Sequence, residues 1–335
     1  MVSPLTLTTL ILTLSVIFVN GLTDAPNAVA TCITTRCLSL RKAVLLSAVF
    51  NFLGVFVMSR ISPAVTETVL KMVNFGNDKN SASITLAAAL FSIVLWAVVA
   101  WYFGIPTSES HALIAGISGS AFALGGGLQA INTSEWSKTI YGLFTSCFGG
   151  FIMGFFVCNA VLFIFRNTKR KHTEKIFKYA QIFTACSMSF MHGAQDGQKF
   201  IAVLLMTVGF SGIKADQKTV SALTVICSLF IALGTLTGGK KIIKSVGIEM
   251  VKLRKYQGFS ADFASSVALL VSTIWGFPVS TTHAKTTAMM GAGLSKNKSS
   301  VNPRVIKDIG LTWLLTFPGC GLLGFFTTKI FLKIF

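Results

Sequence analysis

Long apolar runs separated by short polar stretches make up most of this chain. A helix that crosses a membrane needs about 20 mostly apolar residues, and most of the runs approach or exceed that length. Several are short or interrupted by glycine and proline, as discontinuous helices in transport proteins are. The pattern therefore predicts an all-α integral membrane protein. The predicted segments are roughly 5–31, 43–58, 83–103, 108–126, 139–165, 179–210, 219–237, 260–275, 280–295 and 308–334.

The composition strengthens this interpretation. Of 335 residues, 53% are hydrophobic and only 12% are charged, whereas about 25% of the residues of a soluble domain are charged. An ordinary soluble enzyme and a disordered or fibrous protein are thereby excluded. No basic residue precedes the apolar run Leu5–Val19, since the first is Arg36. We therefore expect a retained transmembrane helix there rather than a cleavable signal peptide.

The charged residues are mostly basic, with 29 lysines and arginines against 11 acidic residues. In a soluble protein this excess would suggest nucleic acid, but here short loops between apolar runs carry it, so we expect no nucleic-acid partner. If 83–126 and 260–295 are hairpins, one face holds 19 basic residues and the other 8. The positive-inside rule then makes the first face cytoplasmic, in the plasma membrane, with both termini outside. The loops of that face are 32–42, 166–178, 239–258 and 296–307.

Several short sequence motifs occur twice in the chain, and the two copies are always separated by the same number of residues, that from Asp24 to Asp196. We call this separation the repeat spacing. The motifs predict a first repeat at 1–165, a basic cytoplasmic connector at 166–178 and a second repeat at 179–335. With an odd number of crossings in each, the repeats are inverted, which is typical of secondary transporters that bind substrate at the repeat interface. The matching pairs are Gly21–Asp24 with Gly193–Asp196, Gly104–His111 with Gly276–His283, and Gly119 with Gly291.

The first candidate site consists of two aspartates inside apolar segments. An acidic side chain at the centre of a bilayer costs at least about 2.5–3.5 kcal/mol, so it usually has a partner and a function. Polar side chains and helix-breaking residues, which free carbonyl oxygens, surround both aspartates. We therefore expect Asp24 and Asp196 each to help hold one small cation, sodium or a proton. The alternative is a pair of buried structural carboxylates. The candidate ligands are Asp24, Asn27, Asp196 and Gln195, with polar neighbours Asn20, Thr23, His192 and Gln198 and helix breakers Gly21, Pro26, Gly193 and Gly197.

The second candidate site is formed by two Gly-x-Pro turns, at 104–106 and 276–278, each followed by hydroxyl residues. Proline stops the preceding helix and serine or threonine caps the next one. The N–H groups and positive dipole end of that helix then face the tip and suit phosphate. Ordinary capping is the alternative, and His111 and His283 beyond the tips are either packing residues or substrate contacts. The candidate anion ligands are Thr107, Ser108, Ser110, Ser280, Thr281 and Thr282.

Stretches spread over both repeats resemble the inorganic phosphate transporter (PiT) family. The resemblance implies cation-driven uptake of phosphate, with sodium or protons as the coupling ion. It also implies two inverted repeats whose hairpin tips meet the phosphate, commonly in a homodimer. The stretches are NGLTDAPNAVAT…TR at 20–36, YFGIPTSESHALI at 102–114, SFMHGAQDGQKF at 189–200, QGFSADFASS at 257–266 and GFPVSTTH at 276–283.

Carried over by position, the resemblance makes Asp24 and Asp196 the family's paired aspartates and Asn27 the asparagine that follows the first. Asp262 matches an acidic residue of the second hairpin that is usually Glu. We expect further effects on coupling or gating from polar residues around the two candidate sites. These residues are Asn20, His192, Gln198, Asp262, His111, His283 and Glu109.

The chain also departs from the family pattern. Thr23 and Gln195 stand where Asn often precedes each aspartate, and Lys199 is a replacement of Asn that is common in one branch. Glu109 adds a negative charge beside the anion site, where it could weaken phosphate binding, be protonated or pair with a cation. These changes bear on the ion stoichiometry more than on the family.

These features predict a secondary active transporter that carries inorganic phosphate with sodium or protons by alternating access, without enzymatic activity or a resident cofactor. The seven cysteines are scattered and form no CxxC pair, so we expect packing residues. Sulfate or another oxyanion would fit the same tips, and a channel is a further alternative. The GxSG string at 116–119 resembles that of rhomboid intramembrane proteases, but the repeat spacing matches Ser118 with Met290, so the repeat argues against proteolysis.

Overall fold

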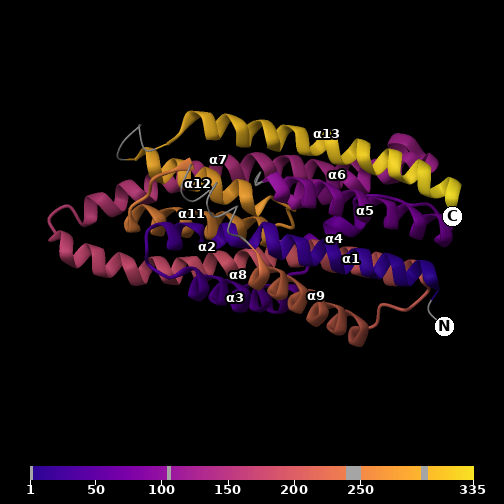
Figure 1. The fold of residues 1–335 in the computed structure, drawn as a ribbon, viewed down its shortest axis with the longest axis horizontal. Coiled ribbons are helices and arrows are strands. Elements are labelled where there is room, and N and C mark those ends of the chain that lie inside the picture. Colours follow the sequence, from indigo (N-terminus) through magenta and orange to yellow (C-terminus); the bar gives the residue numbers. More distant parts are fainter. Residues whose placement is uncertain (1–2, 104–106, 239–249, 296–300) are drawn as a thin grey trace.

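The computed structural model describes residues 3–103, 107–238, 250–295 and 301–335, and most of these are helical (Figure 1). Within these ranges β-pairing is limited to two isolated bridges, so the prediction of an all-α protein is confirmed. A π-helix at Phe122–Gly126 and a 3-10 helix at Gly127–Ala130 follow α6. The α-helices are α1 (Pro4–Thr23), α2 (Ala25–Thr34), α3 (Leu40–Ile61), α4 (Ala64–Lys71), α5 (Lys79–Phe103), α6 (Glu109–Ala121), α7 (Thr133–Ile164), α8 (Arg170–Phe210), α9 (Gln217–Thr237), α11 (Lys255–Ile274), α12 (Thr281–Leu294) and α13 (Pro303–Ile334).

Seven helical stretches among the described residues are long and apolar enough to cross a membrane. Large apolar side chains are exposed on the outer helices, for example Phe148 on α7 and Leu314 on α13, as contact with lipid rather than water allows. The chain is therefore a multi-pass membrane protein, as predicted. Within the described ranges every predicted segment coincides with a helix, while the short α4 and the 3-10 helix were not expected.

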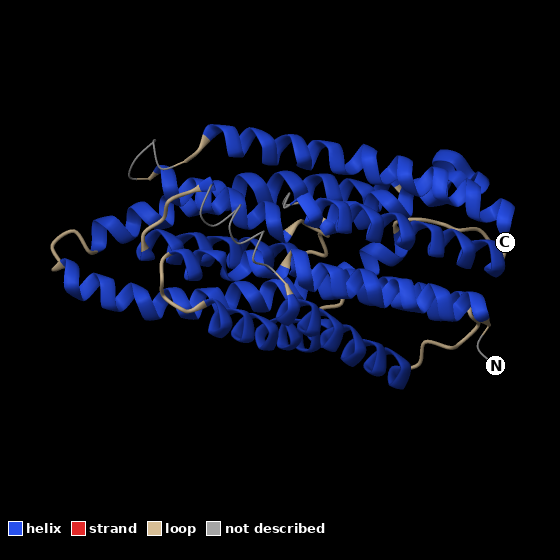
Figure 2. Cartoon of the chain, viewed as in Figure 1, coloured by secondary structure: helices blue, strands red, loops and turns tan. Residues whose placement is uncertain are grey.

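The ends of the molecule divide the loops into two groups. Both termini lie at one end, and the connector between α7 and α8 lies at the other (Figure 2). The loop between α2 and α3 lies at the connector end, as the grouping of the basic loops predicts. The assignment of that end to the cytoplasm rests on the positive-inside rule and stays a prediction.

Two helical hairpins enter from opposite ends and meet near the middle of the molecule (Figure 1). The first is α5 with α6 and the second is α11 with α12. The predicted turn at 104–106 lies outside the described residues. In the second turn Gly276 has a φ of 71°, which glycine adopts readily because it has no Cβ. The two returning helices, α6 and α12, therefore begin deep inside the protein.

The predicted helix break is present in the first repeat and absent from the second. α1 ends at Thr23 and α2 begins at Ala25, because Pro26 has no N–H to continue the helix. By contrast, α8 runs unbroken from Arg170 to Phe210. The expected break near Gly193 and Gly197 is thus wrong, and much of the predicted connector forms the first turns of α8.

The glycines of α8 serve helix packing instead. A Cβ added to Gly193 would clash with the Asn51 carbonyl oxygen of α3, and one added to Gly54 of α3 would clash with that of Phe190. Small residues of this kind let helix backbones approach closely in membranes. The matched glycines serve the same purpose. Gly119 lies where α6 crosses α13, and Gly291 lies where α12 crosses α7.

Candidate functional site

The two predicted aspartates lie at the centre of the protein, where the hairpins meet. Asp24 occupies the junction between α1 and α2, and Asp196 lies midway along α8. Both side chains are buried, with exposed fractions of 3% and 0%. Buried carboxylates need hydrogen-bond donors or cations to offset the loss of hydration.

Asp24 is held by the first turns of both returning helices. Its Oδ2 accepts a hydrogen bond from the backbone N–H of Glu109, at 3.3 Å, in α6. Its Oδ1 accepts one from the Thr282 hydroxyl, at 3.1 Å, in α12. The carboxylate therefore links the break in the first repeat to both hairpins.

Asp196 is held by the same two helix starts. Ser110 in α6 donates to its Oδ1 at 3.1 Å, and Thr281 in α12 donates to its Oδ2 at 3.4 Å. Asn20 from α1 donates to Oδ2 at 3.2 Å, and the Nε2 of His192 lies 3.3 Å from that oxygen. Because adjacent residues of each hairpin serve the two aspartates, the structure brings both predicted sites together.

The repeat spacing relates these contacts to one another. It maps the pair Asp196 and Ser110 onto Asp24 and Thr282, and each pair is hydrogen-bonded. It also maps Glu109 onto Thr281, and each contacts the aspartate of its own repeat. Recurring contacts of this kind are what two related halves around one shared site would produce.

The helix starts have the capping geometry expected from the sequence. Ser108 accepts a hydrogen bond from the N–H of His111, and Ser280 accepts one from that of His283. Ordinary capping therefore explains part of the hydroxyl pattern. The same geometry leaves the positive dipole ends of α6 and α12 directed at the aspartates, where an anion is stabilised.

The first-repeat side of the site has acceptor oxygens in excess of donors. Thr23 donates to Oε1 of Glu109 at 3.0 Å, while Oε2 of Glu109 and Oδ1 of Asn27 have no hydrogen-bond partner among the described residues. Neither Asp24 nor Glu109 forms an ion pair within the described part of the chain. Unpartnered carboxylate and amide oxygens in a buried place are the ligands that a small hard cation prefers.

A lysine balances the second-repeat side. Lys199, one turn after Asp196 on α8, is fully buried, and its Nζ lies 2.7 Å from Oδ1 of that aspartate. Sequence reasoning placed this lysine inside an apolar segment but gave it no role. The free-energy cost of placing a charge inside the bilayer, which singled out the aspartates, applies equally to a lysine. The sequence alone could therefore have marked Lys199 as a functional candidate.

Other predicted residues hold the framework of the site. Gln195 donates to Thr273 of α11 at 3.1 Å, with its Oε1 unpartnered among the described atoms. The Oε1 of Gln198 accepts from the N–H of Val65 at the start of α4. The Nδ1 of His192 lies 2.7 Å from Oδ1 of Asn51 in α3. These contacts fix α8 against its neighbours.

The two matched histidines pack against each other. The rings of His111 and His283 lie edge to face with centroids 4.4 Å apart. His283 also stacks on Trp313, and His111 on Phe317. Of the two roles considered for this pair, the contacts favour packing. Thr107, just before the first cap, is buried.

A second buried ion pair lies away from the central site. Asp262 of α11 pairs with Lys285 of α12, and Thr31 of α2 donates to the same carboxylate at 2.8 Å. The repeat spacing places Leu90 and Leu113 at the equivalent positions of the first repeat. The pair is therefore particular to the second hairpin.

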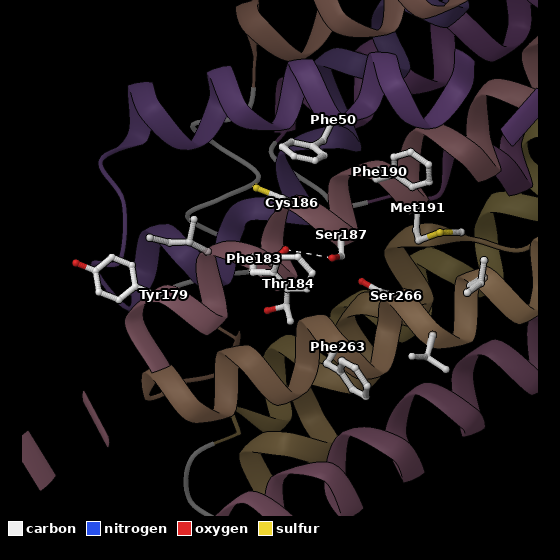
Figure 3. A pocket seen from close by; sticks show the side chains of 13 residues that line it. Phe50, Tyr179, Phe183, Thr184, Cys186, Ser187, Phe190, Met191, Phe263 and Ser266 are labelled. Carbon is white, nitrogen blue, oxygen red and sulfur yellow. Dashed lines mark hydrogen bonds between the residues drawn. The ribbon is translucent and has the colours of Figure 1, made fainter. Parts of the chain in front are cut away.

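A groove of about 600 Å³ beside α8 has a different character (Figure 3). Phe50, Phe183, Phe190 and Phe263 line it, and none of its described lining residues is charged. An anion would lose its hydration there without gaining a positive charge, and the Thr184, Ser187 and Ser266 hydroxyls already donate to backbone carbonyls. The groove is therefore not a phosphate site. It suits apolar groups such as lipid chains.

Comparisons relate this chain to proteins named as phosphate transporters. The profile described as "Phosphate transporter family" matches residues 20–324. The "Probable low-affinity inorganic phosphate transporter" of Bacillus subtilis is 33% identical over 96% of this chain and 95% of its own. That of Rhizobium meliloti is 33% identical over 92% and 90%. A solved structure titled "The sodium-dependent phosphate transporter" superposes with a TM-score of 0.86 at 22% identity, over 99% of this chain and 100% of the other.

Proposed function

This chain belongs to the phosphate transporter family, and from that premise we propose that it is a secondary active transporter that carries inorganic phosphate together with a cation. The observation that carries the proposal is the meeting of two buried aspartates with the N-terminal ends of α6 and α12. The protein would act in the plasma membrane, with its basic loops on the cytoplasmic side. A homodimer remains part of this proposal.

Phosphate would bind at the two helix starts. Backbone N–H groups and aligned peptide dipoles there stabilise an anion. The hydroxyls of Ser110, Thr281 and Thr282 donate to the aspartates in this structure. A rotation about their C–O bonds would direct the same protons to phosphate oxygens once a cation compensates the carboxylates.

A cation is required by the charges at the site. Among the described residues, Asp24, Asp196 and Glu109 are buried together with one ammonium group, that of Lys199. Phosphate adds at least one more negative charge, and carrying each negative charge into the cell against the membrane potential costs about 2.3 kcal/mol per 100 mV. The oxygen-rich surroundings of Asp24 suit sodium, and a proton on a carboxylate would serve the same purpose.

Transport by the purified protein tests this proposal. In proteoliposomes with labelled phosphate, we expect an inward sodium or proton gradient to drive accumulation above the external concentration. Separate sodium and pH gradients identify the coupling ion. Equilibration without accumulation would indicate a channel, and strong inhibition by excess sulfate would indicate a broader oxyanion permease.

A further inference from the structure

The ammonium group of Lys199 lies in a cage of oxygen atoms. Its Nζ is 2.7 Å from Oδ1 of Asp196, 2.6 Å from Oγ of Ser110 and 2.5 Å from the carbonyl oxygen of Val279 at the second hairpin tip. Carboxylate, hydroxyl and carbonyl oxygens are also the usual ligands of small hard cations. The lysine therefore lies where a free cation would otherwise be expected.

These contacts leave the ammonium group with no proton to offer a substrate. A lysine side chain has three N–H donors and no acceptor, and three oxygens lie within hydrogen-bond distance of Nζ. The side chain is fully buried. In this arrangement Lys199 balances Asp196 and ties α8 to both hairpins, and it does not act as a ligand of phosphate.

The internal repeat shows what the first half has instead. The repeat spacing relates Lys199 to Asn27. Lys199 donates to the hydroxyl of Ser110, which contacts Asp196, and Asn27 donates to the hydroxyl of Thr282, which contacts Asp24. The Oδ1 of Asn27 has no partner among the described residues. Where one half has a resident positive charge, the other has an amide with a free oxygen.

We propose that Lys199 is a built-in counter-ion that permanently occupies the second-repeat cation position. Of the two cation positions that the repeat spacing relates, only the one beside Asp24 is then left for a transported cation. The repeat spacing assigns its ligands, which are Asp24, Asn27, the Thr282 hydroxyl and the carbonyl oxygen of Thr107. This inference rests on the proposed phosphate symport and fixes how many cations it uses, one fewer than two symmetric aspartate sites would bind.

Replacing the lysine by the residue of the other half tests the inference. In Lys199→Asn the cage gains an amide oxygen and loses its positive charge, so a mobile cation should enter. In proteoliposomes, the charge moved per labelled phosphate should increase by one elementary charge over wild type. The dependence of uptake on sodium, or on protons if these drive uptake, should become steeper and shift to higher concentration.

Two further substitutions at this position separate charge from shape. Lys199→Arg keeps a positive charge, so the charge moved per phosphate should equal that of wild type. Lys199→Met supplies neither a charge nor an oxygen, so its uptake should be lost and high sodium should not restore it. Lys214→Asn, in the exposed loop before α9, is the matched control and should transport as wild type does.

The mirror substitution gives an independent measurement if Lys199→Asn does not fold. Asn27→Lys would place a second ammonium in the remaining cation position, so phosphate binding should lose its dependence on sodium and pH. An unchanged charge per phosphate in folded Lys199→Asn, or an unchanged cation dependence in folded Asn27→Lys, would overturn the inference. Absence of uptake by wild type would instead overturn the proposed symport.

Discussion

Asp24→Asn is expected to reduce cation-driven phosphate uptake by about 10- to 100-fold. The carboxylate contacts both returning helices and has no basic partner in the described structure, so it is the main negative charge available to a transported cation. Loss of a charged hydrogen-bonding partner costs about 1.5–3 kcal/mol, and each 1.4 kcal/mol is a factor of about ten in affinity. The measurement is the initial rate of labelled phosphate uptake into proteoliposomes at a fixed cation gradient.

An exposed aspartate provides the control for this substitution. Asp78 lies in the loop before α5, and its carboxylate accepts hydrogen bonds from the backbone N–H groups of Asn80 and Ser81 and from the Ser81 hydroxyl. Those bonds hold the pKa of its carboxyl below the usual value, chiefly through the Ser81 hydroxyl. Asp78→Asn should therefore transport like wild type. Equal rates for wild type and a correctly folded Asp24→Asn would remove this aspartate from the mechanism.

Lys285→Met is expected to destabilise the protein by about 3–5 kcal/mol, because it leaves the buried carboxylate of Asp262 without its positive partner. Among the described side chains, Thr31 alone would then donate to that carboxylate. Thermal unfolding of the purified protein in detergent measures the effect as a lower midpoint. An unfolding midpoint equal to that of wild type would show that the pair does not stabilise the second hairpin.

The first repeat supplies the matched double variant. It has Leu90 and Leu113 at the equivalent positions, and both are buried in an apolar cluster. Replacing a whole buried ion pair by apolar residues is often neutral or stabilising. Asp262→Leu with Lys285→Leu should therefore recover most of the lost stability. If the double variant is stable but transports poorly, the pair serves gating, as the sequence suggested for Asp262.

Sequence reasoning singled out the residues that meet at the centre of the protein because their signals are local. A carboxylate in an apolar segment and a Gly-x-Pro turn before hydroxyls are visible without knowledge of the neighbours. The repeat spacing then related Asp24 to Asp196 and each hairpin start to the other. The structure adds that each aspartate contacts both hairpins. These contacts join segments far apart in the chain, so no single segment could predict them.

The features that the sequence did not predict depend on partners in three dimensions. Gly193 was expected to break a helix, but the backbone of α3 lies against it, so it serves close packing. Lys199 and Lys285 were visible as charges in apolar segments, yet their roles follow from the oxygens around them. The continuity of α8 likewise depends on tertiary contacts that outweigh the weak helix propensity of glycine.

Binding of phosphate to the purified protein at equilibrium is the most direct test of the central claim, that a cation at Asp24 and phosphate at the helix starts stabilise each other. Calorimetric titrations at several sodium concentrations and pH values give the phosphate Kd. We expect phosphate to bind more tightly as the concentration of the coupling cation increases, and phosphate to raise the affinity for that cation by the same factor. A phosphate Kd independent of both sodium and pH would contradict it.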